Sequence, residues 1–102
     1  MESGIIYGLS AAMYGEITVA DGAVQQTAFH DYPVVRMNDA PAIEIHIVNS
    51  DAPWGGAGEP GTPGIAPALA NAIYAATGTR VRQLPVSQYD FEYRIEEQEE
   101  LI

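Results

Sequence analysis

The chain has 102 residues, which fits one domain with a modest core, and its hydrophobic fraction of 47% is that of a folded protein. Four arginines against 14 acidic residues give a formal net charge of −10, which argues against binding to nucleic acids or anionic membranes. The chain has no cysteine, which excludes disulfides, thiolate-bound zinc and iron–sulfur clusters within it.

Residues 3–14 are predicted to form a helix, because apolar residues recur there at steps of three and four. Ser3 is the expected N-cap, and Gly15 stands where a C-terminal glycine is common. The predicted apolar stripe consists of Ile5, Ile6, Leu9, Ala12 and Met13.

Residues 16–29 are predicted to form a β-hairpin. β-branched residues flank Asp21 and Gly22, a dipeptide suited to a turn with positive φ. The following residues, 30–41, are predicted to be extended, because their two prolines keep the preceding residues out of the helical region.

Residues 42–50, AIEIHIVNS, carry the clearest strand signal in the chain. Isoleucine alternates with other residues, which is typical of a strand with one buried face. The two faces carry Ile43, Ile45 and Ile47 on one side, and Glu44, His46 and Val48 on the other.

A glycine-rich loop, residues 54–64, precedes the strongest helix signal. Thr62 is the predicted N-cap, and Pro63 is expected to be a proline of the first turn. Pro67 is expected to lie within the first turn as well, where a missing N–H is tolerated. Gly78 is predicted to end the helix. Its predicted buried stripe consists of Ile65, Leu69, Ala72, Ile73 and Ala76.

The alanines of this second helix leave room for another backbone to pack closely, as in a helix inside a larger assembly. Residues 80–86 are predicted to be a short strand. Six acidic residues fall within the last thirteen positions, and we interpret residues 89–102 as a solvated acidic tail.

Glu59 is the leading candidate for catalysis. The glycines around it allow a ligand to approach the main chain, and the following helix directs its N-terminal N–H groups at the loop. In a dry site such a carboxylate can act as a general base. The alternative is a helix-entry loop in which Glu59 caps the helix or is solvated. The loop lacks the Lys-Ser/Thr pair of a phosphate-binding loop.

Other candidates are weaker. His30 with Asp31, and Glu44 with His46 and Asp51, have residue types that bind metals but lack the spacing of a recognised three-ligand site. A small acidic metal-binding domain built on the second group is one alternative reading. Trp54, beside the glycine-rich loop, could border a substrate pocket, although packing is the simpler role.

The segments ESGIIYGLSAAMYGEIT, FHDYPVVRMNDAPAIEIHIV, GGAGEPGTPGIAPALANAIYAATG and RVRQLP together resemble the C-terminal end of a molybdenum hydroxylase large subunit. The resemblance covers residues 2–86 and is to the xanthine dehydrogenase/aldehyde oxidase family, isoquinoline 1-oxidoreductase β-subunit type. It implies that Glu59 is the base, that Gly56 and Gly58 lie on the side of the molybdenum–molybdopterin cofactor, and that the substrates are N-heteroaromatic compounds or aldehydes.

The resemblance also has departures. Position 64 is Gly where proline is expected, and the glycine- and glutamine-containing loops that make most cofactor contacts in the family are missing. We therefore expect a split subunit, the product of an internal start, or a truncated remnant, inactive alone. It would bind the cofactor only with the rest of the large subunit and an iron–sulfur subunit. The alternative is a non-catalytic remnant or a small domain that self-associates.

The predicted fold is α+β, with a mixed or antiparallel sheet of about four strands and two helices packed on it. Residues 1–88 would be the C-terminal portion of a molybdopterin-binding domain, and residues 89–102 the tail. Neither a signal sequence nor a membrane-spanning segment is predicted, so a cytoplasmic location is the default expectation.

Overall fold

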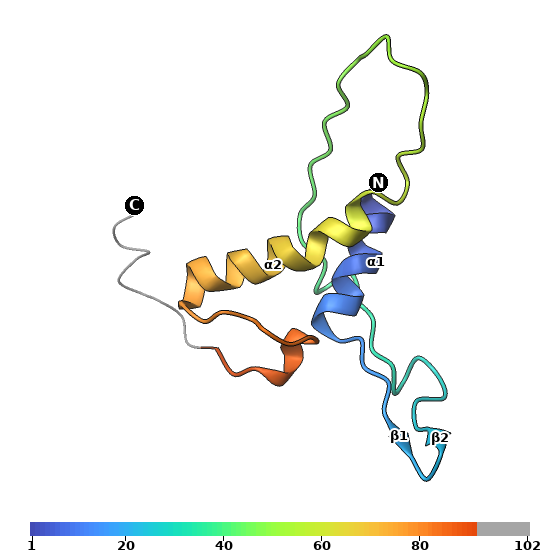
Figure 1. The fold of residues 1–102 in the computed structure, drawn as a ribbon, viewed down its shortest axis with the longest axis vertical. Coiled ribbons are helices and arrows are strands. Elements are labelled where there is room, and N and C mark those ends of the chain that lie inside the picture. The colour runs from blue at the N-terminus through green and yellow to red at the C-terminus, as the bar shows by residue number, and fades with distance from the viewer. Residues whose placement is uncertain (92–102) are drawn as a thin grey trace.

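The computed structural model describes residues 1–91 of the chain. Its elements are helix α1 (Glu2–Met13), strands β1 (Val19–Ala20) and β2 (Ala23–Val24), helix α2 (Gly61–Thr77) and the short 3₁₀-helix η1 (Val86–Gln88). The two helices cross, and the β-hairpin and the long loop before α2 project from them in opposite directions (Figure 1). Neither helix in this part of the chain has the length and apolar character needed to cross a bilayer.

The crossing of α1 and α2 depends on glycines of α1. A Cβ atom added at Gly8 would lie 2.5 Å from the carbonyl oxygen of Thr62 and 2.5 Å from Cγ2 of Ile65. One added at Gly4 would lie 2.5 Å from the carbonyl oxygen of Gly58. The Thr62 hydroxyl donates a hydrogen bond to the Gly4 carbonyl at 2.9 Å. Residues without side chains therefore set how closely α2 and its preceding loop approach α1.

Helix α1 confirms the first predicted helix but differs at both ends. It begins after Met1, so Ser3 lies within the first turn and no side chain caps the helix. At the other end, the N–H groups of Tyr14 and Gly15 both donate to the Ser10 carbonyl, at 3.0 and 3.1 Å. Gly15 is not among the glycines with positive φ, so the helix ends without a left-handed residue.

Helix α2 starts earlier than predicted and ends where predicted. It starts at Gly61, so Thr62 is not the N-cap, and its hydroxyl bonds to α1 instead. Because of this earlier start, Pro67 lies in the second turn rather than the first. Gly78 ends the helix as predicted, with φ of 79° and its N–H bonded to the Tyr74 carbonyl at 2.8 Å.

The hairpin is confirmed. Val19 pairs with Val24 and Ala20 with Ala23 in antiparallel register. Asp21 and Gly22 both have positive φ, 53° and 76°, which is the backbone conformation that a two-residue turn of this kind requires.

The predicted four-stranded sheet is wrong for the described residues, in which the hairpin is the sheet. Residues 42–50 are not assigned as a strand, because none of the described residues pairs with their backbone. Residues 80–86 are not a strand either. The N–H groups of Arg82 and Gln83 donate to the Tyr89 hydroxyl, at 3.0 and 3.1 Å. These two backbone groups are therefore not available for hydrogen bonds to a neighbouring strand.

Two other predictions also need correction or lie beyond the described chain. The segment 30–41 contains a turn on each side of a short extended stretch. In the first turn the N–H groups of Asp31 and Tyr32 donate to the Ala28 carbonyl, at 3.2 and 3.1 Å. In the second, those of Asp39 and Ala40 donate to the Arg36 carbonyl at 2.9 Å. Residues 92–102, which contain most of the predicted acidic tail, lie outside the described residues. The division of the chain at residue 88 stays a prediction.

The apolar core is small. Its buried hydrophobic residues are Leu9, Ala12, Val35 and Val86, and α2 contributes none. The predicted stripe of α2 is half-buried, and Ala72 on it is exposed. The radius of gyration is 17.0 Å, whereas a compact domain of this length has about 13 Å. The accessible surface is 8230 Å², against about 5,600 Å² for a compact chain of this mass. Large hydrophobic side chains such as Met37 and Trp54 are exposed, so the described residues leave apolar surface open.

Replacing Gly8 by alanine is expected to lower the free energy of unfolding by about 1–2 kcal/mol, since the overpacking cost exceeds the gain in helix propensity. Gly64→Ala is the matched control, because a Cβ there meets nothing within 4 Å and the helix gains propensity. Urea denaturation followed by circular dichroism measures both. Equal stability of the two variants would show that the close crossing is not formed.

Candidate functional site

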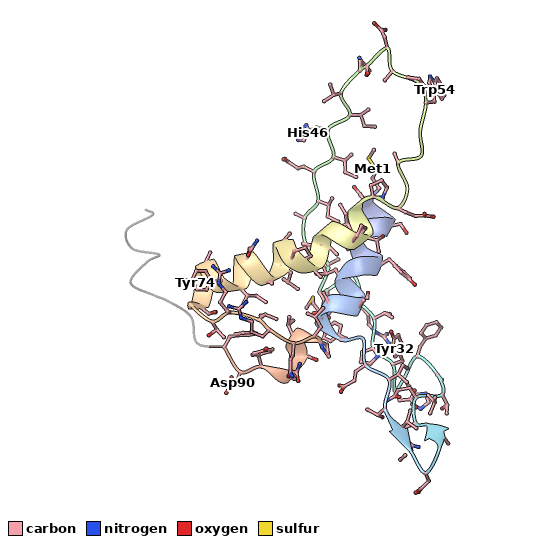
Figure 2. The ribbon with its side chains drawn as sticks, viewed as in Figure 1. Met1, Tyr32, His46, Trp54, Tyr74 and Asp90 are labelled. Atoms are coloured by element: carbon pink, nitrogen blue, oxygen red, sulfur yellow. The ribbon has the colours of Figure 1, made fainter. Side chains whose placement is uncertain are left out.

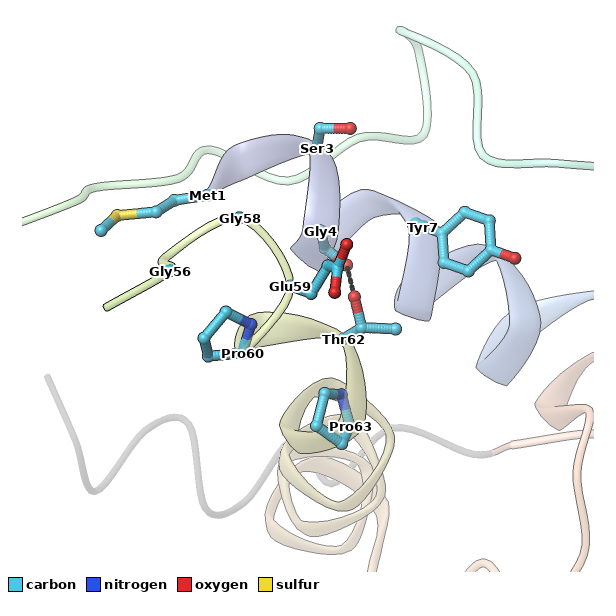
Figure 3. A pocket seen from close by; sticks show the side chains of 10 residues that line it. All are labelled: Met1, Ser3, Gly4, Tyr7, Gly56, Gly58, Glu59, Pro60, Thr62 and Pro63. Atoms are coloured by element: carbon cyan, nitrogen blue, oxygen red, sulfur yellow. Dashed lines mark hydrogen bonds between the residues drawn. The ribbon is translucent and has the colours of Figure 1, made fainter. Parts of the chain in front are cut away.

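A cavity of about 1140 Å³ lies between the start of α1, the glycine-rich loop and the first turn of α2. Figure 3 shows the Glu59 side chain beside Gly4 and Thr62, at the place where the two helices meet. The polar side chains of the lining are one carboxylate and three hydroxyls, those of Glu59, Ser3, Tyr7 and Thr62. The cavity therefore brings together a proton acceptor and several hydrogen-bonding groups.

The position of Glu59 follows from the helix crossing. Its carbonyl oxygen accepts a hydrogen bond from the Thr62 N–H at 3.0 Å, and the Thr62 hydroxyl is bonded to Gly4. These two bonds join the main chain of Glu59 to the start of α2 and, through Thr62, to α1. The carboxylate itself is exposed. The described residues alone therefore do not form the dry site that a general base was predicted to need.

Gly56 and Gly58 line the same cavity, as expected for residues on the cofactor side. A Cβ atom added at either glycine would meet nothing within 4 Å. No group among the described residues fills the space beside them, so an external group can approach both backbones. Their role at a cofactor stays a prediction.

Trp54 does not line the cavity and is fully exposed, at 102% of its reference accessible area. Figure 2 shows it on one arm of the projecting loop, with His46 on the other arm. The described residues thus leave the indole without a packing partner, and its position at the border of a substrate site stays a prediction.

Ser3 and Tyr7 are the site residues that the sequence reasoning missed. They lie four residues apart on α1 and face the cavity together. Tyr7 is 73% exposed. Their i, i+4 spacing was visible in the sequence, but it indicates only a shared helix face and not what lies opposite that face.

The metal-ligand candidates form pairs rather than sites. His30 lies 3.8 Å from Asp31, and His46 lies 3.7 Å from Glu44. Within residues 1–91 no group of three His, Asp or Glu side chains could hold a metal ion. Asp51 does not join the second pair, so the reading as a small metal-binding domain has no support in this part of the chain.

Asp31 has a structural role. Its carboxylate accepts hydrogen bonds from the N–H groups of Thr27, at 3.0 and 3.1 Å, and Ala28, at 3.0 Å. These backbone bonds, first Ala28 and then Thr27, lower the pKa of Asp31 below its ordinary value of 3.8. The carboxylate therefore closes the turn that follows the hairpin.

Comparison with known proteins identifies the chain as related to oxidoreductase subunits. It is 43% identical over 86 residues to the isoquinoline 1-oxidoreductase subunit beta of Brevundimonas diminuta, which covers 84% of this chain and 11% of that protein. It is 33% identical over 89 residues to a membrane-bound aldehyde dehydrogenase (pyrroloquinoline-quinone) of Gluconacetobacter polyoxogenes, covering 87% of this chain and 12% of that protein. It is also 35% identical over 89 residues to the aldehyde oxidoreductase molybdenum-binding subunit of Escherichia coli K12, which covers 78% of this chain and 12% of that protein.

Over most of its length the chain is therefore similar to subunits of molybdenum hydroxylases, which confirms the resemblance seen in the sequence. No protein-family model matches it. The chain spans about a tenth of the length of these relatives. The match to the Brevundimonas diminuta protein spans 86 of the 102 residues, so at most 16 residues lie before or after it. Residues 17–86, and therefore Glu59, fall within the match wherever it begins.

The turn closed by Asp31 is expected to depend on pH. Because the folded pKa is depressed, the stabilisation is complete above the unfolded value of 3.8 and is lost as the pH falls through the lower folded value. The amide NMR shifts of Thr27 and Ala28 should follow this titration. Asp31→Ala should remove the response and Asp51→Ala should keep it. A midpoint at or above 3.8 would contradict the assigned hydrogen bonds.

Proposed function

We propose that the chain forms the glutamate-bearing wall of the active site of a molybdopterin-dependent hydroxylase, with Glu59 as the base. The observation that carries the proposal is the position of Glu59 at an open cavity, on a segment shared with oxidoreductase subunits. The substrates proposed are N-heteroaromatic compounds or aldehydes. The relatives include an isoquinoline oxidoreductase, a nicotinate dehydrogenase and aldehyde-oxidising enzymes.

The residues present fit one side of a pterin cofactor. The two glycine backbones have free space in front of them, and the hydroxyls and the carboxylate can exchange hydrogen bonds or protons with a bound group. The lining contributed by the described residues contains no arginine. A phosphate group on the cofactor would therefore depend on N–H groups at the helix starts or on cations outside the described lining.

The bound cofactor would supply the oxygen atom for hydroxylation and receive the two electrons taken from the substrate. Glu59 would accept a proton on a carboxylate oxygen as the reaction begins. Gly56 and Gly58 would let the cofactor approach the main chain, and the bonds through Thr62 would hold the Glu59 backbone in place. Water would be excluded by residues of another chain, since this chain leaves Glu59 exposed.

The proposal requires partner chains. Most of the large subunit of a relative has no counterpart in a chain that spans about a tenth of it. The electrons must also leave the site, and a chain without cysteine cannot bind an iron–sulfur cluster through thiolates. We therefore propose that the chain acts with the remainder of a large subunit and with an iron–sulfur subunit.

Glu59→Gln in the complex isolated from the source cells is expected to lower turnover of a heteroaromatic or aldehyde substrate by about 10²–10⁴-fold, the usual contribution of a positioned general base. Molybdenum content should be unchanged, because the substitution removes the proton acceptor and keeps the shape of the side chain. Dye-linked oxidation assays and elemental analysis measure the two quantities.

Glu16→Gln is the control, since Glu16 is an exposed glutamate outside the cavity lining. Full activity of Glu59→Gln would disprove the assigned base. A complex that contains pyrroloquinoline quinone and no molybdenum would disprove the proposed cofactor, which is a specific concern because the name of one relative includes that quinone.

A further inference from the structure

We propose that the turn of the β1–β2 hairpin is a modification site, at which Asp21 isomerises to isoaspartate through a cyclic succinimide. The main-chain nitrogen of Gly22 attacks Cγ of Asp21. A carbon–nitrogen bond forms, and the carboxyl hydroxyl leaves as water with the proton of the N–H group. Water then opens the five-membered ring by breaking the bond between the nitrogen and the former main-chain carbonyl carbon. The product has the same composition, but its main chain runs through the Asp21 side chain. The proposal does not depend on the function proposed above.

The first observation is that both reacting groups are accessible. Asp21 and Gly22 are exposed at the tip of the hairpin, which projects from the helices (Figure 1). A Cβ atom added at Gly22 would meet nothing within 4 Å, so the space around its nitrogen is open. Within the described residues, the Gly22 N–H donates no hydrogen bond and the Asp21 carboxylate accepts none. Neither group has to leave a partner before the ring can close.

The other four aspartates of the chain lack this combination. After three of them, the N–H group of the next residue is held in a hydrogen bond. The bonds are those of Tyr32 to the Ala28 carbonyl at 3.1 Å, Ala40 to the Arg36 carbonyl at 2.9 Å, and Ala52 to the Ser50 hydroxyl at 3.0 Å. The fourth, Asp90, precedes Phe91, whose ring stacks on Tyr89 with 5.3 Å between the centroids. Among the described aspartates, Asp21 is therefore the one followed by a glycine with a free N–H group.

Two of these aspartates are restrained at the carboxylate as well. Asp31 accepts the hydrogen bonds that close its turn, from Thr27 and Ala28. Asp39 accepts a hydrogen bond from the Tyr14 hydroxyl at 3.1 Å. Both carboxylates would have to give up these bonds before a succinimide could form. The structure therefore protects Asp31 and Asp39 and leaves Asp21 unprotected.

The backbone of the turn opposes the reaction only weakly. The turn has to open for the nitrogen to reach Cγ, and the strands that hold it closed have two residues each. Such a short hairpin has little stability of its own. Asp21 has a φ of 53°, in the left-handed region that L residues seldom occupy, so opening the turn also relieves this conformation. Local opening at the tip is therefore expected without unfolding of the helices.

Isomerisation would undo the tip of the hairpin and keep its base. The added main-chain atom is incompatible with the two-residue turn, so the pairing of Ala20 with Ala23 would be lost. The bonds from Gln25 Nε2 to the carbonyls of these two residues, at 3.3 and 3.0 Å, would be lost with it. At the base, the Gln25 N–H donates to the Thr18 carbonyl at 2.9 Å, and Gln26 Oε1 accepts from the Thr18 N–H at 2.8 Å. These bonds do not involve the turn and should persist.

Incubation of the 102-residue chain in water enriched in heavy oxygen tests the site, because each ring opening places one heavy oxygen on the residue. Peptide mass spectrometry measures the label at each aspartate, in buffer and in guanidinium chloride. Labelling of Asp21 in the folded chain should be within about threefold of its rate in denaturant. Asp31 and Asp39 should be slowed at least about tenfold by folding. This ratio removes the intrinsic effect of the glycine. Slowing of Asp21 by tenfold or more would overturn the proposal.

A pair of variants provides a faster measurement. Asp21→Asn should lose ammonia through the same ring, and the intact mass then changes by the difference between an amide and an acid. Asp51→Asn is the matched control, because Asp51 is also an exposed loop aspartate but its next N–H is bonded to Ser50. Its conversion should be at least about tenfold slower. Equal rates, or an Asp21→Asn chain that does not convert, would overturn the proposed ring closure.

Amide NMR tests the structural consequence on the same incubated samples. The signals of Ala20 and Ala23 should move to new positions in proportion to the isoaspartate content. Those of Thr27 and Ala28, in the neighbouring turn closed by Asp31, should stay in place. An isoaspartate-containing chain that keeps the original Ala20 and Ala23 signals would overturn the predicted loss of pairing.

Discussion

The close crossing of α1 and α2 is the constraint on which the rest of the structure depends. It exists because Gly4 and Gly8 present no side chain to the backbone of Gly58 and Thr62. The bond from the Thr62 hydroxyl to the Gly4 carbonyl fixes the same contact from the other side. Glu59 lies between Gly58 and Thr62 in the chain, so the residues that bring the helices together also place the carboxylate at the cavity.

Features with a local cause could be predicted from the sequence. The hairpin follows from Asp21 and Gly22, which adopt the positive φ angles that its turn requires. The left-handed end of α2 follows from Gly78 in the same way. Features that depend on partners could not be predicted. The alternation through residues 42–50 predicts a strand, but a strand forms only where a neighbouring backbone supplies the hydrogen bonds, and none of the described residues does so.

The candidate site was likewise predicted only in part from the sequence. Glu59, Gly56 and Gly58 stand out in the sequence because a carboxylate is set among glycines just before a helix, and all three line the cavity. Ser3 and Tyr7 reach it only because α1 crosses the start of α2, which no local pattern indicates. The family resemblance suggested the chemistry of Glu59, while the exposure of its carboxylate shows that the described residues alone do not enclose it.

The central claim is that this chain supplies one wall of a molybdenum site that other chains complete. The most direct test is the native mass of the chain isolated from its source cells, together with its metal content. The account predicts a complex far heavier than the 10.9 kDa of the chain alone, with about one molybdenum per copy. A metal-free monomer or homo-oligomer would contradict it and leave the chain as a folded relative of these subunits without their chemistry.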